Sequence, residues 1–290
     1  MAQNIIEKEW DLEIEPSNNV FNLHLKEVWE YRDLLWLLVR RDFVSFYKQT
    51  ILGPLWFFIQ PIFTTIIFTF IFSNLANIST NGSPAPLFYM AGTVAWNYFS
   101  DSLTKTSTVF RDNVNIFGKV YFPRLIMPMS IVFSNLVKFG VQFILFIVLM
   151  VYFLVRYHFY NGPKVEPNFY LLLFPLVMAL MAILGLGFGL IITALTTKYR
   201  DLTFVVSFGM QLLMYATPVI YPLSSAPAKY RGFIALNPMS GLIETFRYGF
   251  IGTGHFYLGA FIYSIIASVI VFILGLIIFN RVEKSFVDTI

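Results

Sequence analysis

The chain has 290 residues, of which 57% are apolar and only 12% are charged. A soluble domain carries about twice that share of charge, so the composition excludes a soluble globule and indicates an integral membrane protein. The chain has no cysteine, which excludes disulfides, thiolate metal sites and a cysteine nucleophile. The net charge of +4 says less about the orientation in the membrane than the positions of the individual Lys and Arg residues do.

The N-terminal region divides into a charged tail and a helix. Residues 1–25 carry charges of both signs, and no apolar run of signal-peptide length follows them, so we expect a retained cytoplasmic tail. Residues 26–48 predict an amphipathic helix in the inner membrane interface, because apolar side chains recur at helical spacing at Val28, Tyr31, Leu35 and Leu38. The alternative is an ordinary cytoplasmic helix packed on soluble protein.

Weakly charged stretches predict six membrane-spanning helices. A helix needs about 20 mostly apolar residues to cross the hydrocarbon core. Apart from Asp101 and Lys138, the predicted spans contain no charged residue; they lie at 55–76, 87–104, 129–155, 169–196, 203–221 and 258–280. The predicted fold class is therefore an all-α integral membrane protein with a six-span domain over residues 49–280.

The distribution of Lys and Arg predicts the orientation. With the N-terminus in the cytoplasm, 14 of these residues lie in inner segments and 5 in outer segments. This bias places both termini in the cytoplasm, with residues 281–290 as a second cytoplasmic tail. Lys138 lies within span three, where we expect its side chain to reach toward the inner headgroups.

Two connecting segments carry further information. The inner loop 105–125 is polar and ends at Phe122-Pro123, which predicts a short helix that is a docking surface or a plain solvated connector. The outer segment 222–257 is too apolar for a free loop. Asn237-Pro238 begins a helix there that Gly252 ends, and we expect re-entrant or interfacial helices. Glu244 and Arg247 lie three residues apart on one face of this helix, so we expect them to pair with each other or with a neighbouring chain; the alternative is an exposed pair that contributes little.

Catalytic and nucleotide-binding motifs are absent from the sequence. It contains no G-x-x-x-x-G-K-[ST], no H-E-x-x-H and no G-x-S-x-G. The three histidines lie in different segments, so we expect no metal site. Gly185, Gly187 and Gly189 favour close helix packing. No span has an acidic residue at its centre, so ion-coupled transport is not indicated and the energy comes from elsewhere.

Spans one and five combine aromatic side chains with amides and hydroxyls. Such side chains can stack on sugar rings and bond their hydroxyls, or they can face lipid and form interfacial belts. The candidates for a sugar-lined substrate path are Trp56, Gln60, Gln211, Tyr215 and Tyr221.

Several stretches resemble one family, the permease subunits of bacterial ABC-2 exporters for O-antigen, capsule and teichoic acid polysaccharides. Residues 38–61 resemble the family's entry into span one, with matches at Arg41-Asp42, Tyr47-Lys48-Gln49-Thr50, Leu52-Gly53, Trp56 and Pro61. Residues 198–202 (KYRDL), 217–222 (TPVIYP) and 236–247 (LNPMSGLIETFR) are similar to later signatures of the family. The resemblance runs in order from about residue 38 to 280 and leaves out the first 25.

The resemblance implies a homodimer in the bacterial inner membrane that works with two copies of a separate cytoplasmic ABC ATPase. ATP and Mg²⁺ are then bound by that partner, this chain binds no cofactor or nucleic acid, and the cargo is a polysaccharide on undecaprenyl diphosphate. The residues implied for ATPase coupling, or for fixing the inner helix ends, are Arg40, Arg41, Asp42, Arg111, Asp112, Lys119, Arg200 and Asp201. The outer segment 222–257 becomes a gate that involves Asn237, Pro238, Glu244 and Arg247.

Three other functions stay open at this point. An ABC-2 exporter of a drug or small lipid shares the span count. A membrane-embedded transferase needs clustered acids or a histidine at one membrane face, which the sequence lacks. A passive channel would conduct without ATP.

Overall fold

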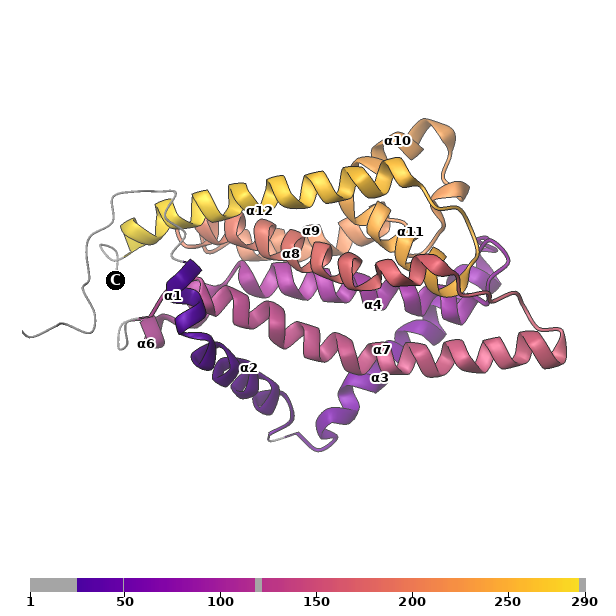
Figure 1. Cartoon of the computed structure of the whole chain (residues 1–290), viewed down its shortest axis with the longest axis horizontal. Helices are drawn as coiled ribbons and strands as arrows, with labels where there is room; N and C mark the ends of the chain where they lie inside the picture. Colours follow the sequence, from indigo (N-terminus) through magenta and orange to yellow (C-terminus); the bar gives the residue numbers. More distant parts are fainter. Residues whose placement is uncertain (1–24, 49, 118–121, 287–290) are drawn as a thin grey trace, which may run out of the picture.

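The computed structural model describes residues 25–48, 50–117 and 122–286, and these residues form helices and no strand (Figure 1). The expected all-α class is therefore confirmed. Residues 1–24, almost the whole predicted N-terminal tail, lie outside the described residues. So do residues 287–290 of the predicted C-terminal tail.

The predicted amphipathic helix is present as two helices. These are α1 (Leu25–Glu30) and α2 (Arg32–Tyr47), which meet at Tyr31. Val28, Leu35 and Leu38 form one buried face, Tyr31 is half-buried, and Trp36 is exposed. The buried face of α2 packs against α7.

Four helical stretches are long and apolar enough to cross a bilayer. They are Gly53–Leu75, which includes α3 (Trp56–Phe68), Ile126–Tyr160 (α7), Phe169–Thr196, which includes α8 (Phe174–Thr196), and Leu258–Val282 in α12 (Leu258–Phe286). They correspond to predicted spans one, three, four and six. At 35 residues, α7 is about 52 Å long and exceeds the roughly 30 Å hydrocarbon core.

The remaining two predicted spans form helices of a different character. Helix α4 (Ala85–Thr106) has 22 residues and is enclosed by α3, α7, α8 and α11, so it does not need an apolar surface on every side. Helix α9 (Leu202–Ala216) has only 15 residues and ends five residues before the predicted boundary. The boundary was wrong because Thr217 precedes Pro218 and adopts an extended conformation (φ −102°, ψ 147°).

The main helices run side by side, and the short helices and connecting segments lie at the two ends of the bundle (Figure 1). One end holds α1, α2 and the two single-turn helices α5 (Val109–Asp112) and α6 (Val114–Phe117); we call it the α2 end. The opposite end holds α10 (Ala228–Leu236), and we call it the α10 end. The C-terminal part of α12 reaches the α2 end (Figure 1).

Glycines bring α8 close to its two neighbours, as the sequence predicted. A Cβ on Gly189 would lie 2.5 Å from Cβ of Thr106 in α4. A Cβ on Gly187 would lie 2.8 Å from Cα of Phe272 in α12, and one on Gly275 would lie 2.5 Å from the carbonyl oxygen of Gly187. Helix α8 is therefore held between α4 and α12 at backbone distance.

Aromatic packing holds α11 (Pro238–Ile251) against α7 and α8. The rings of Phe143 and Phe174 stack at 4.6 Å, and Phe250 meets both rings edge-on at 5.4 Å. The rings of Phe246 and Phe250 are 4.8 Å apart. These contacts place part of the phenylalanine content inside the bundle, in addition to the lipid-facing side chains.

We expect the substitution Gly187→Ala to destabilise the protein by about 1–3 kcal/mol, because α12 must move to admit the methyl group. Gly140→Ala in α7 is the control: nothing lies within 4 Å of that Cβ, so the alanine raises helix stability by up to about 1 kcal/mol. Thermal unfolding in detergent measures both variants. An unchanged midpoint for Gly187→Ala would show that the α8–α12 contact is loose.

Candidate functional site

Three helices meet in a polar cluster near the α2 end. Within α2, the guanidinium of Arg41 donates to Oδ1 of Asp42 from Nε at 2.9 Å and from Nη2 at 2.7 Å. The Ser134 hydroxyl of α7 donates to Oδ2 of Asp42 at 3.4 Å. The predicted Arg41-Asp42 dipeptide therefore forms an ion pair at the contact between α2 and α7, which fits a role in fixing the end of the helix.

A second part of this cluster joins α4 to α7. Nζ of Lys138 lies 2.5 Å from Oδ2 of Asp101, and only 17% of the Lys138 side chain is exposed. Nζ of Lys105 donates to Oδ1 of Asn135 at 3.2 Å, and Nδ2 of Asn135 donates to Ser102 at 3.4 Å. Lys138 thus pairs with an acid inside the bundle, whereas the sequence predicted contact with the headgroups. The sequence showed both charges but could not show that they face each other.

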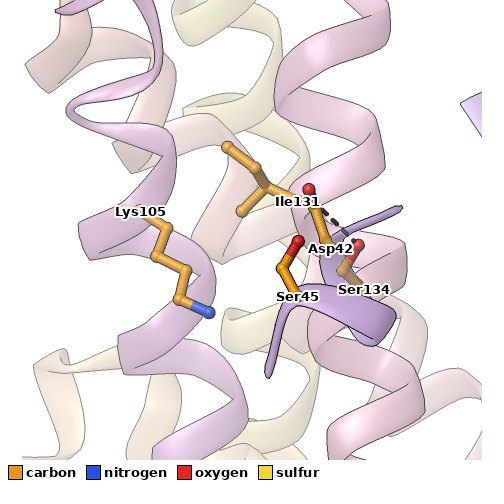
Figure 2. Close-up of a pocket in the computed structure, with 5 residues that line it drawn as sticks. All are labelled: Asp42, Ser45, Lys105, Ile131 and Ser134. Atoms are coloured by element: carbon orange, nitrogen blue, oxygen red, sulfur yellow. Dashed lines mark hydrogen bonds between the residues drawn. The ribbon is translucent and has the colours of Figure 1, made fainter. Parts of the chain in front are cut away.

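A pocket of about 420 Å³ separates α2 from α4 in this region. Figure 2 shows Lys105 on one side and Asp42, Ser45 and Ser134 on the other, with Ile131 in the wall. The ionised groups are already bonded within the protein, Asp42 to Arg41 and Lys105 to Asn135. The pocket therefore lies beside the contact of α2 with α7 and separates α2 from Lys105 of α4.

The predicted docking loop forms a corner at the α2 end. In α5, Nε of Arg111 lies 3.1 Å from Oδ1 of Asp112, and the Thr108 hydroxyl donates to Oδ2 of Asp112 at 2.6 Å. Arg111 also donates to the Thr203 hydroxyl, at 3.5 Å, in the first turn of α9. The loop residues therefore lie beside the turn between α8 and α9.

The other predicted coupling residues are placed as follows. Arg40, Arg200 and Asp201 are exposed. Asp201 immediately precedes α9 and lies near Thr203, so the Arg111-Asp112 and Arg200-Asp201 dipeptides share one corner. Lys119 lies outside the described residues.

Two buried threonines that the sequence analysis did not select also belong to this corner. The Thr193 hydroxyl lies 2.6 Å from the carbonyl oxygen of Thr106, and the Thr196 hydroxyl lies 2.5 Å from that of Ser107. The available signal was the spacing of small and hydroxyl residues at Gly189, Thr193 and Thr196 in an otherwise apolar span.

The helix predicted within the outer segment 222–257 begins where the sequence indicated. Asn237 caps α11 because its side-chain oxygen accepts from the amide of Met239 at 3.0 Å, and Pro238 occupies the first helical turn. Nδ2 of Asn237 donates to the Thr217 hydroxyl at 2.7 Å. Gly252 ends the helix with φ +75°, which favours glycine. Asn237 therefore ties the start of α11 to the end of α9.

Glu244 and Arg247 are buried in α11, and only 3% of the Arg247 side chain is exposed. Nη1 of Arg247 lies 3.5 Å from Oε1 of Glu244 and donates to the carbonyl oxygen of Pro218 at 2.6 Å. Its Nη2 donates to the carbonyl oxygen of Val219. The alternative of an exposed pair is therefore wrong, and the two residues face the break after α9.

Two residues of α4 complete the surroundings of Arg247. The Phe88 ring lies 3.7 Å from Cζ of Arg247, which is a cation–π contact. A Cβ on Gly92 would overlap Nη2 of Arg247 and lie 2.7 Å from the carbonyl oxygen of Val219, so only glycine leaves room for the guanidinium. In addition, Oε1 of Glu244 accepts from the amide of Leu223 at 3.2 Å. One arginine thus connects α4, α11 and the segment after α9.

Four of the predicted path residues lie on α3 and α9, Tyr221 lies in the segment after α9, and all five are at least partly accessible in the single chain. Trp56 and Tyr215 are each 52% exposed. Gln60 and Gln211 are exposed, and Tyr221 is half-buried. The described residues contain no group of three or more His, Asp or Glu side chains that could hold a metal ion.

Comparison with known proteins identifies the family. Residues 33–251 match the family described as ABC-2 type transporter. The chain belongs to this family. The resemblance noted from the sequence is therefore confirmed over three quarters of the chain.

Named relatives of this ABC-2 chain include two permeases called O-antigen export system permease protein RfbA. The one from Myxococcus xanthus is 30% identical over 226 residues, which are 77% of this chain and 82% of that protein. The one from Klebsiella pneumoniae is 29% identical over 257 residues, 88% of this chain and 94% of that protein. The capsule polysaccharide export inner-membrane protein CtrC of Neisseria meningitidis is 22% identical over 256 residues, 86% and 90% of the two chains.

We expect Arg247→Met to cost about 3–5 kcal/mol, because it leaves Glu244 and two backbone carbonyls buried without their partner. The double substitution Glu244→Gln/Arg247→Met removes the stranded charge and should be less destabilising. Thermal unfolding of the purified protein measures both. Equal losses in the single and double variants would contradict a dominant ionic contribution.

Proposed function

We propose that the chain is the permease subunit of an ABC transporter that exports a polysaccharide on an undecaprenyl diphosphate carrier. The observation that supports this most is the 30% identity, over 82% of its length, to a protein named as an O-antigen export permease. A second relative is named for capsule polysaccharide export. The proposal places the chain in the bacterial inner membrane as a multi-pass protein.

The proposed topology has six spans with both termini in the cytoplasm. Helices α4 and α9 supply spans two and five, and α10 and α11 are the re-entrant helices of the outer face. Two observations support this assignment: the α2 end carries the loop rich in Lys and Arg, and the end of α12 reaches the same side (Figure 1). Helix α4 crosses inside the bundle, so its polar residues bond to neighbouring helices.

The proposed assembly is a homodimer with two cytoplasmic ABC ATPase subunits. Gln60 and Gln211 support the dimer, because both are exposed on apolar helices of the single chain. An amide in hydrocarbon lacks hydrogen-bond partners, whereas a second copy or a polar path between two copies supplies them. With Trp56, Tyr215 and Tyr221, these amides form the proposed sugar path.

The proposed mechanism assigns the chemistry to the partner and the movement to this chain. The ATPase subunits bind ATP with Mg²⁺ and hydrolyse it. They dock on α2 and on the corner formed by α5, where Arg111 contacts Asp112 and Thr203. Displacement of this corner moves the ends of α8 and α9. At the opposite face, Asn237 and Arg247 hold α11 against the end of α9, as an outer gate requires.

The alternative within the family is export of a drug or small lipid. A strain that lacks the chain separates the two cargoes. Export of polysaccharide predicts that lipid-linked glycan accumulates on the cytoplasmic side and that surface polysaccharide is lost. Normal surface polysaccharide without this accumulation would reject the proposed cargo and favour the small-molecule alternative.

Charge reversal in the inner loop tests coupling. We expect Arg111→Glu/Asp112→Arg to lower export at least about tenfold while the ATPase still hydrolyses ATP, because docking at this corner depends on local charge. Surface polysaccharide per cell and ATP hydrolysis by the purified complex are the two measurements. Unchanged export would remove the loop from the mechanism.

The matched control for this variant is an exposed ion pair between α7 and α8. Nζ of Lys164 lies 3.0 Å from Oε2 of Glu166. Hydrogen bonds from Lys164 and then Tyr157 lower the pKa of the Glu166 carboxyl, so it is ionised at neutral pH. Lys164→Glu/Glu166→Lys changes as much charge as the loop variant but on the proposed outer face, and it should leave export unchanged.

The absence of cysteine makes the topology directly testable. Single cysteines at Gly82, Gly162 and Gly232 should react with a membrane-impermeant maleimide in intact cells. Cysteines at Asn113 and Ser285 should react only after permeabilisation. Labelling of Asn113→Cys in intact cells would reverse the proposed orientation.

A further inference from the structure

The corner between α4 and α5 is bonded to the end of α8 by side chains whose role the proposed function leaves open. Thr193 and Thr196 lie one turn apart on α8 and are 1% and 5% exposed. The Thr196 hydroxyl is 2.5 Å from the carbonyl oxygen of Ser107, against 3.2 Å from that of Thr193 in its own helix. Its shorter bond therefore crosses to the corner.

Thr193 makes the neighbouring contact. Its hydroxyl lies 2.6 Å from the carbonyl oxygen of Thr106 and 2.7 Å from that of Gly189 in α8, so its single proton is shared between the two helices. Thr106 is the last residue of α4, and the carbonyls of a last helical turn require donors from outside the helix. The two threonines meet this requirement from α8.

Close backbone approach makes these bonds short and leaves little room for movement between α4 and α8. A Cβ on Gly189 would lie 2.5 Å from Cβ of Thr106, and one on Gly185 would lie 3.2 Å from Cβ of Ser102. The close contact between α4 and α8 therefore runs along the half of α4 that ends at the corner. Any shift of the corner relative to α8 must break buried hydrogen bonds or separate tightly packed backbones.

The opposite side of α8 extends the connection. Gly187 and Gly275 bring α8 and α12 to backbone distance, so the two helices move together. The contact of α2 with the bundle is different, because it combines an apolar face packed on α7 with one hydrogen bond, from Ser134 to Asp42 at 3.4 Å, beside an open pocket (Figure 2). The α4–α5 corner is instead joined to α8 by two shorter hydrogen bonds at a close backbone contact.

We propose that Thr193 and Thr196 are positioning residues that carry the displacement of the inner loop to α8 and, through Gly187 and Gly275, to α12. This inference rests on the proposed function, since it requires an ATPase that moves the loop. The hydroxyls connect the corner to α8, and the glycines connect α8 to α12. The α8–α12 pair then follows each ATPase cycle as one body.

The test compares export with ATP hydrolysis in proteoliposomes that contain the permease and its ATPase. Thr193→Val/Thr196→Val keeps the side-chain shape and removes both hydroxyls. We expect ATP hydrolysis to continue while glycan exported per ATP falls at least about fivefold. Thr196→Ser retains the hydroxyl and should keep the wild-type ratio. A wild-type ratio in the double valine variant would overturn the proposal.

Thr197→Val is the matched control. Its hydroxyl donates to the carbonyl oxygen of Thr193 within α8, at 2.7 Å, and makes no described bond to the corner. We expect no change in the ratio of export to hydrolysis. An equal fall in Thr197→Val and in the double variant would show a general effect of lost hydroxyls on α8 and would overturn the proposal.

A cross-link covers the case in which the valine variant fails to fold. Ser102→Cys/Gly185→Cys places two Cβ atoms about 3.2 Å apart, near the separation of about 3.8 Å found in disulfides, in a chain with no other cysteine. The oxidised variant should export as fast as the same variant kept in reductant, because α4 and α8 move together. Export lost on oxidation and restored by reductant, or failure of the disulfide to form, would overturn the proposal.

The wild-type complex separates failure of this inference from failure of the proposed function. If it hydrolyses ATP without moving glycan, the proposed cargo is wrong. If it exports glycan and Arg111→Glu/Asp112→Arg uncouples it while the double valine variant does not, the loop acts without the threonines.

Discussion

Hydrocarbon offers no hydrogen-bond partner, and the position of α4 follows from this constraint. The helix carries Asp101, Ser102 and Lys105, which no lipid-facing helix could hold without cost. It is enclosed by α3, α7, α8 and α11, and its polar side chains bond to Asn135 and Lys138 of α7. The other helices therefore surround α4, with the more apolar ones free to meet lipid.

The same constraint applies to the backbone carbonyls at helix ends inside the bundle, because these oxygens also need hydrogen-bond donors. At the α2 end, threonine hydroxyls of α8 bond the carbonyls that close α4. At the α10 end, Arg247 bonds the carbonyls of Pro218 and Val219, which the interruption after α9 leaves without helical donors. At both of these points the carbonyls are bonded by a side chain from another helix, and those side chains connect segments distant in sequence.

These two connections suit a transporter whose energy is supplied from outside the chain. The corner that contains Arg111 is bonded to α8, and the backbones of α8 and α12 are in close contact. A displacement of the inner loop would therefore be transmitted to both helices. Gln60 and Gln211 are exposed on α3 and α9, on the surface where we propose that a second copy binds. A transporter driven by separate ATPase subunits needs both features: closely packed helices that transmit the movement of the inner loop, and an exposed surface for the second copy of the proposed dimer.

The sequence alone determined the membrane class, the approximate positions of the four long apolar helices and both ends of α11, because these depend on local properties: apolar length, the Asn237-Pro238 cap and the glycine at 252. It also indicated the Glu244–Arg247 pair, since a separation of three residues places both on one helix face. Only the tertiary structure decided that Lys138 meets Asp101, that Gly92 makes room for Arg247, and that Thr196 bonds Ser107. Each of these contacts joins residues far apart in the chain, and no local pattern specifies which faces of two helices will meet.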